Sequence, residues 1–139
     1  MTMDDRVDDA ELVTKPAPVI GPARLLPAFR YACQGLAAAW RTEGAFRQEV
    51  LAALVLVPVA VSLPLPPLER ALLVASVFLV MMVELLNSSL EAAVDRISLE
   101  RHPLSKHAKD TGSAAVMMAI AIAALLWAVI VGGWLLRVG

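Results

Sequence analysis

The sequence predicts an all-α membrane protein with an N-terminal amphipathic surface helix followed by three transmembrane helices. Hydrophobic residues make up 59% of the 139 residues and charged residues only 18%, whereas about 25% of an ordinary soluble domain is charged. Three apolar segments approach the ~20 residues that a helix needs to cross a bilayer. These segments leave no room for a separate soluble catalytic domain, so any chemistry takes place in or at the membrane.

Residues 1–23 have the composition of a disordered tail. Five acidic and two basic residues are accompanied by three prolines, and the segment has too few apolar residues to build a core. A secretory signal peptide begins with basic residues and continues with an apolar stretch, so this acidic start does not predict one. We expect a single membrane-embedded domain over residues 24–139.

The surface helix is expected at about residues 24–42. Its apolar residues recur at spacings of three and four: Leu26, Phe29, Cys33, Leu36 and Trp40. A core helix of a soluble bundle has the same period. The apolar segments that follow favour a helix lying in the membrane interface.

The three transmembrane helices are expected at about residues 46–66, 69–95 and 110–136. The apolar run of the first is short and is ended by a group of prolines. Its helix must therefore begin near Phe46 to cross the bilayer. The third is apolar throughout its length.

Basic residues flanking the spans predict their orientation. Most of them precede the first span or lie between the second and the third: Arg24, Arg30, Arg41, Arg47, Arg96, Arg101, Lys106 and Lys109. The loop between the first two spans has only Arg70, and Arg137 follows the third. Because cytoplasmic loops carry the excess of Lys and Arg, we expect a cytoplasmic N-terminus and a C-terminus on the outer side.

Polar residues form a ladder on one face of the second span. At about 100° per residue, Glu84, Asn87, Ser88, Glu91 and Asp95 fall within one stripe of a helix. An ionised carboxylate in a span costs at least about 2.5 kcal/mol, so the ladder should face other protein groups. One interpretation is that it only joins helices through hydrogen bonds, and the other is that it carries chemistry.

The ladder offers candidates for acid–base and metal chemistry. Glu84 lies deepest in the span and is the candidate general base. Glu91 lies two turns nearer the cytoplasm, where its carboxylate suits a hard divalent cation. Glu43, at the turn into the first span, is either a second ligand or an exposed acid that pairs with Arg47. The single cysteine excludes an intrachain disulfide, and two histidines are too few for a structural zinc site.

The segment 101–113 is polar, basic and on the cytoplasmic side. A lysine at position 109 can contact phosphate as a point charge, and Asp110 beside it can hold a ribose hydroxyl or orient the lysine. Flanking charge of the positive-inside kind explains Lys109 equally well. No Walker A loop and no GxGxxG motif occurs in the sequence.

These residues resemble the prokaryotic integral-membrane diacylglycerol kinases. The matching segments are AWRTEGAFRQE at 39–49, VELLNSSLEAAVDRI at 83–97 and LSKHAKDTGSAAV at 104–116. The resemblance runs from about Arg24 to the C-terminus and leaves out the acidic tail. Residues 103–106 look closer to the undecaprenol kinase branch of the family, whereas the AFRQE and GSAAV segments favour the diacylglycerol branch.

The resemblance implies a homotrimer of three-span subunits in the inner membrane, with a periplasmic C-terminus and active sites shared between neighbouring subunits at the cytoplasmic interface. It implies ATP-dependent phosphorylation of a membrane lipid alcohol, from diacylglycerol to phosphatidic acid, with magnesium as cofactor. No nucleic acid partner is expected. Undecaprenol phosphorylation is the alternative reaction. A membrane assembly protein without enzymatic activity is the alternative of another class.

The resemblance also assigns site residues. The family's catalytic base matches Glu84, and its magnesium ligands match Glu43 and Glu91. Its nucleotide-binding positions match Arg24, Tyr31, Glu43, Glu91, Glu100, His102, Lys109 and Asp110. Its lipid-binding positions match Arg24, Arg47, Gln48, Glu84, Asn87, Ser113 and Trp127.

Overall fold

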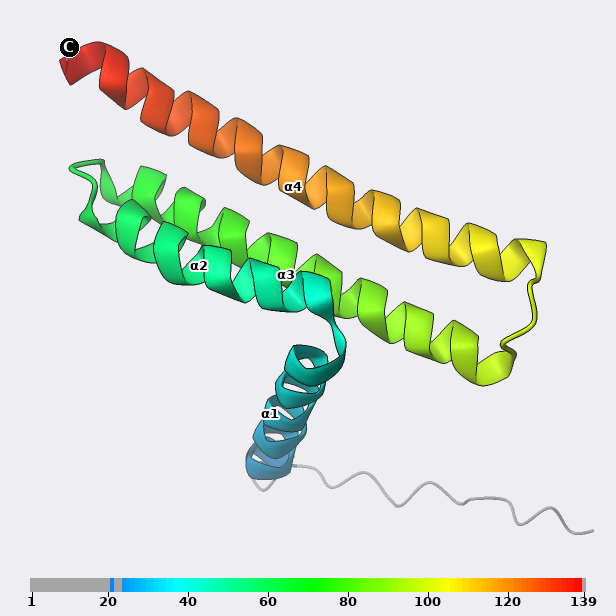
Figure 1. Cartoon of the computed structure of the whole chain (residues 1–139). Coiled ribbons are helices and arrows are strands. Elements are labelled where there is room, and N and C mark those ends of the chain that lie inside the picture. The colour runs from blue at the N-terminus through cyan, green and yellow to red at the C-terminus, as the bar shows by residue number, and fades with distance from the viewer. Residues whose placement is uncertain (1–20, 22–23, 139) are drawn as a thin grey trace, which may run out of the picture. The chain divides into compact units, whose positions relative to one another are not determined.

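A computed structural model describes residues 21 and 24–138, and their regular structure is entirely helical (Figure 1). The helices are α1 (Leu25–Thr42), α2 (Gly44–Ser62), α3 (Pro67–Ile97) and α4 (Pro103–Val138). The last three are long and apolar enough to cross a bilayer. The predicted order of one helix followed by three spans is therefore confirmed. Apart from Gly21, the predicted tail lies outside the described residues.

The chain divides between residues 34 and 35 into two units. The first unit contains the beginning of α1, where Leu25, Leu26 and Phe29 are all exposed on one face. The described residues of this unit leave the apolar stripe uncovered, as expected for a helix that lies in the membrane interface. The second unit contains the rest of α1 and the three long helices.

Proline determines where the first span ends. Glu43 is the one residue between α1 and α2, and α2 begins at Gly44, before Phe46. Pro58 is accommodated inside α2, but the helix ends at Ser62, four residues before the predicted limit of about 66. The reason is that helical backbone is disfavoured for the residue that precedes a proline. Leu63, which precedes Pro64, accordingly has extended backbone with ψ 139°.

α3 is the central helix of the second unit. It packs against α2 on one side and α4 on the other, and it runs antiparallel to both (Figure 1). Near the α2–α3 turn, Ala60, Leu65 and Leu73 form a buried cluster against which Trp127 and Trp134 of α4 pack. The opposite end of α3 carries the polar ladder.

The buried cluster generates a stability prediction. Leu73 is fully buried, whereas its neighbour Leu72 is 40% exposed. Leu73→Ala should lower the free energy of unfolding by about 2 kcal/mol, the low end for buried leucines, because lipid is as apolar as leucine and only packing is lost. Leu72→Ala should stay within about 0.5 kcal/mol of wild type. Unfolding in detergent measures both variants, and equal losses would contradict the assigned cluster.

Candidate active site

The ladder on α3 passes from a dry to a wet environment. Glu84 is only 6% exposed, Asn87 and Glu91 are half-buried, and Asp95 is exposed. The exposure rises along one face because α2 and α4 cover α3 near Glu84 and leave its last turns open to water. The carboxylates of one stripe therefore meet three different surroundings.

A cavity of about 340 Å³ opens where the first turn of α2 and the facing surfaces of α3 and α4 meet. We call it the carboxylate cavity, and its lining residues are Glu43, Ala45, Glu84, Asn87, Ser88, Glu91, Ser113 and Val116. Three carboxylates share this space, and no lysine or arginine among the described residues lines it. Such a cavity attracts a cation or a proton. Of the residues predicted for the site, it brings together Glu43, Glu84, Asn87, Glu91 and Ser113.

Two hydrogen-bond donors lie beside carboxylates of this cavity. The Thr42 hydroxyl has one proton, which it can donate to Glu43 Oε1 at 3.1 Å or to the Ala38 carbonyl oxygen at 3.2 Å. The Asn87 side-chain amide donates from Nδ2 to Glu91 Oε1 at 3.1 Å. Glu43 precedes the first residue of α2 but makes no side-chain cap hydrogen bond to that helix. Each carboxylate thus keeps an oxygen for another ligand.

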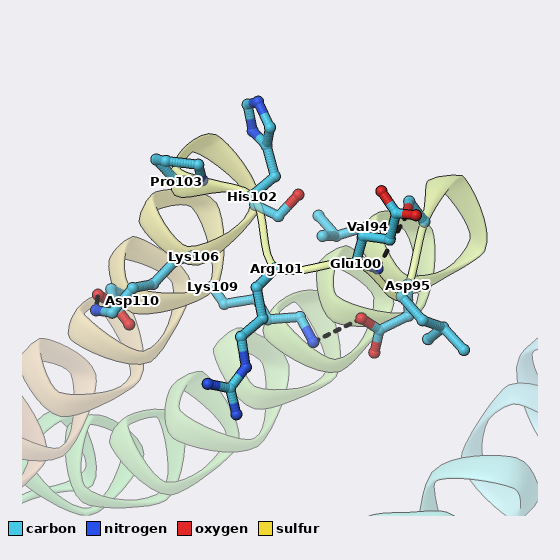
Figure 2. A pocket seen from close by; sticks show the side chains of 12 residues that line it. Val94, Asp95, Glu100, Arg101, His102, Pro103, Lys106, Lys109 and Asp110 are labelled. Atoms are coloured by element: carbon cyan, nitrogen blue, oxygen red, sulfur yellow. Dashed lines mark hydrogen bonds and ion pairs between the residues drawn. The ribbon is translucent and has the colours of Figure 1, made fainter.

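A second cavity, of about 600 Å³, surrounds the connection between α3 and α4 (Figure 2). We call it the loop cavity. It collects four of the residues predicted to bind nucleotide: Glu100, His102, Lys109 and Asp110. The ring of His102 accepts the backbone N–H of Leu104 at Nδ1 over 3.2 Å, which satisfies one of the free donors at the start of α4. Its Nε2 atom is left for another contact.

Two ion pairs hold the two lysines of the loop cavity. Figure 2 shows Lys109 reaching from α4 to Asp95 on α3, with 2.7 Å between Nζ and Oδ1. Lys106 pairs with Asp110 one turn along α4. Sequence reasoning placed Asp95 on the ladder but gave it no function. Asp95 contacts a lysine that lies fourteen positions later, in another helix. A sequence pattern within one helix does not contain the distance between two helices, so it could not reveal this contact.

A third, largely apolar cavity of about 400 Å³ lies between α2, α3 and α4. We call it the apolar cavity. Trp127, predicted to support the lipid site, lines it together with Glu49. Trp127 Nε1 and Glu49 Oε2 are buried without a hydrogen-bond partner among the described residues. Glu49 was not predicted to be functional, although a carboxylate placed directly before an apolar run is a signal that could have found it.

Four predicted residues line none of these cavities. Arg47 and Gln48 are exposed on the first turns of α2. Arg47 donates to the carbonyl oxygen of Arg41 at 3.4 Å and makes no ion pair with Glu43 within residues 24–138, so the alternative pairing is not found. Arg24 and Tyr31 belong to the first unit, where both are exposed.

Comparisons with known proteins agree on one family. The sequence profile described as prokaryotic diacylglycerol kinase matches residues 30–131. The chain is 53% identical over 113 residues to a diacylglycerol kinase of Pseudomonas aeruginosa, covering 81% of this chain and 92% of that protein. It is 50% identical over 110 residues to the diacylglycerol kinase of Escherichia coli K12, covering 79% and 90%. For the Haemophilus influenzae diacylglycerol kinase the values are 45% over 107 residues, 77% and 91%.

Proposed function

Because the chain belongs to the prokaryotic diacylglycerol kinase family, we propose that it transfers the γ-phosphoryl group of ATP to diacylglycerol and produces phosphatidic acid. The observation that carries this proposal is the carboxylate cavity, which joins a buried glutamate to two more exposed ones at the end of three membrane-spanning helices. Phosphoryl transfer asks a protein mainly for positioning and charge stabilisation, so a chain of this size suffices.

We assign proton acceptance to Glu84. The lipid hydroxyl oxygen forms a bond to the γ-phosphorus while the bond to the β–γ bridging oxygen breaks and ADP leaves. The hydroxyl proton passes to the Glu84 carboxylate, which is the ladder acid farthest from water. An alcohol on a lipid reaches this depth more readily than a soluble substrate, because its acyl chains stay in the bilayer. The depth of Glu84 therefore favours a lipid acceptor.

The residues of the carboxylate cavity fit a magnesium ion. Mg²⁺ prefers oxygen ligands, keeps several waters and is commonly held by one or two carboxylates together with substrate phosphates. Glu43 and Glu91 supply such a pair of carboxylates. Within residues 21 and 24–138, no group of three or more His, Cys, Asp or Glu side chains is arranged to hold a metal ion. When bound, the ion supplies neutralisation of the phosphate charge during transfer.

We assign the nucleotide to the loop cavity. The Lys109 ammonium, held by Asp95, is positioned to contact phosphate, and Asp95 limits the directions in which it points. Glu100, His102 and Asp110 surround the remaining space, and Arg24 and Tyr31 stay predicted contributors from the first unit. The loop cavity and the carboxylate cavity share α3, where Glu91 and Asp95 are one turn apart, so phosphates can extend from one to the other.

The lipid is assigned to the membrane side of Glu84. Asn87 and Ser113 line the carboxylate cavity, and Trp127 lines the apolar cavity next along the bundle. The nearly all-apolar lining of that second cavity suits acyl chains or a glycerol backbone bearing one polar group. Arg47 and Gln48, on the first turns of α2, remain predicted contacts of the lipid headgroup.

Orientation and assembly complete the proposal. The basic flanks favour a cytoplasmic N-terminus and a periplasmic C-terminus in the inner membrane. The two arginines at the outer end have local partners: Arg137 lies 4.0 Å from Glu69, and Arg70 donates to the Val61 carbonyl at 3.4 Å. We propose a homotrimer, and since one chain supplies all three cavity glutamates, sharing between subunits concerns other residues.

Two alternative functions would use the polar residues of α3 differently. Phosphorylation of undecaprenol would use the same carboxylates with a different lipid groove, and the residues 103–106 favour it. A non-enzymatic assembly protein would need the ladder only for helix association. The three carboxylates around one cavity without a neutralising lysine or arginine favour chemistry, because helix association requires no such concentration of acids.

The first prediction tests the reaction and its base. Purified protein in lipid with Mg-ATP should form phosphatidic acid from diacylglycerol faster than it phosphorylates undecaprenol. Glu84→Gln should lower turnover at least about 100-fold, because an amide cannot accept the proton. Glu69→Gln, a change of the same kind at the other end of α3, is the matched control and should keep activity. If neither lipid is phosphorylated, the kinase proposal is wrong.

A second prediction separates the base from the metal ligands. Glu43→Gln and Glu91→Gln should raise the magnesium concentration needed for half-maximal activity by roughly tenfold or more, because a neutral amide is a poorer ligand for a hard dication. Glu84→Gln should leave that concentration unchanged while lowering turnover. Magnesium titrations of initial rates measure both effects. A common shift in all three variants would make Glu84 a ligand and place the base elsewhere.

A third prediction concerns the subunit origin of the glutamates. Glu43 and Glu84 of one chain line the same cavity, so mixed assemblies of Glu84→Gln chains and Glu43→Ala chains contain no intact set. Their activity should stay at background, although differently tagged chains purify together. Mixtures of Glu84→Gln with wild-type chains are the control and should retain activity in proportion to the wild-type share. Restored activity in the first mixture would show that one site takes its glutamates from different subunits.

A further inference from the structure

Gly112 on α4 lies against Asn87 of α3 more closely than any side chain would permit. A Cβ atom at this position would collide with Asn87 Oδ1 and would come within 3.3 Å of Asn87 Cγ and 3.2 Å of Leu90 Cδ2. Gly132 and Gly133 of the same helix have open space at the equivalent point, with nothing within 4 Å. A glycine inside a helix costs about 1 kcal/mol relative to alanine. At Gly112 that cost coincides with a close approach between two helices.

The Asn87 amide is held at both of its ends. Its Nδ2 atom donates to Glu91 Oε1 at 3.1 Å, and only the NH₂ end of an amide can donate to a carboxylate. Its Oδ1 atom therefore points the other way, toward Gly112, and is buried without a hydrogen-bond partner among the described residues. This oxygen occupies the volume that a Cβ atom of residue 112 would need.

A methyl group at position 112 would have to displace one of these neighbours. Leu90 can move aside, because the atom concerned is the far end of a flexible side chain and the residue is 39% exposed. Asn87 cannot keep its place, because the methyl group would fill the volume of Oδ1. Rotation of the amide then breaks the hydrogen bond to Glu91, which is charge-assisted and correspondingly strong. Glu91 would lose the contact that fixes its carboxylate.

We propose that Gly112 is a positioning residue for Glu91: its missing side chain seats the Asn87 amide, and the amide orients the carboxylate in the carboxylate cavity. This inference rests on the proposed function only where it connects Glu91 to magnesium. The contact between Gly112, Asn87 and Glu91 depends only on how α3 packs against α4, so it can be tested without substrate.

Asn87 is the only asparagine in the sequence, which gives a direct probe of the contact. Protein labelled with ¹⁵N-asparagine shows a single side-chain amide signal by NMR in detergent, without ATP or magnesium. Glu91→Gln should shift this signal, because the acceptor loses its charge, and Gly112→Ala should shift it because the amide is displaced. Gly132→Ala is the matched control and should leave it at the wild-type position. A wild-type signal in Gly112→Ala would overturn the proposal.

Magnesium titrations of activity then test the consequence. Gly112→Ala and Asn87→Ala should each raise the magnesium needed for half-maximal rate by about 10-fold, the usual effect of removing support from a metal ligand. The double variant should add little to either, because both act through the same hydrogen bond. Asn87→Ala needs no room at position 112 and so tests the step even if Gly112→Ala assembles poorly. Additive shifts, or none in Asn87→Ala, would overturn the positioning function.

The two proposals fail in different ways. If Glu91→Gln leaves the magnesium dependence unchanged, the metal assignment is wrong, while the NMR signal still decides whether Gly112 seats Asn87. If Glu91→Gln changes the magnesium dependence and Gly112→Ala does not, the metal assignment holds and Gly112 has no positioning function. The same Gly132→Ala variant serves as the control in both experiments.

Discussion

The lack of water in the bilayer is the constraint on which the rest of this structure depends. A polar group in hydrocarbon has no solvent to bond, so the acidic stripe of α3 must be covered by protein. α2 and α4 both pack against α3, where they bury Glu84 and leave Asn87 and Glu91 half-buried. The candidate site is therefore located where the polar stripe is only partly covered, at the end of the bundle that carries most of the basic residues.

A single helix sorts the chemical tasks by their distance from water. Glu84 is nearly enclosed, Glu91 lies two turns further on, and Asp95 is exposed at the end of α3. A proton acceptor for a lipid hydroxyl suits the first position and a carboxylate for a hydrated cation the second. The third position suits a partner for Lys109, the lysine that we propose contacts phosphate. The α-helical repeat spaces these positions, since seven residues correspond to about 10 Å along the axis.

Contacts between α3 and α4 hold the cavities in register. The pair formed by Asp95 and Lys109 joins the helices near the connection between them, and the close approach at Gly112 joins them about one turn further along α4. The first pair is exposed to solvent, which screens its charges, so it adds little to stability. Steric exclusion at Gly112 cannot be screened by salt or water, so it constrains the orientation of Asn87 more strictly than a charge pair could.

The sequence by itself determined the helices, their proline boundaries and the polar stripe of α3, because hydropathy, proline stereochemistry and the 100° repeat are properties of consecutive residues. The stripe and the turn into the first span already made Glu84, Glu91 and Glu43 candidates, and the resemblance assigned base and magnesium functions to the same residues. Only the tertiary structure decided that these three line one cavity of one chain, and that Asp95 meets Lys109. It likewise placed Glu49 and Trp127 on the walls of one apolar cavity. These distances depend on how each helix is rotated about its axis and how closely it packs, and a pattern read along one segment contains neither quantity.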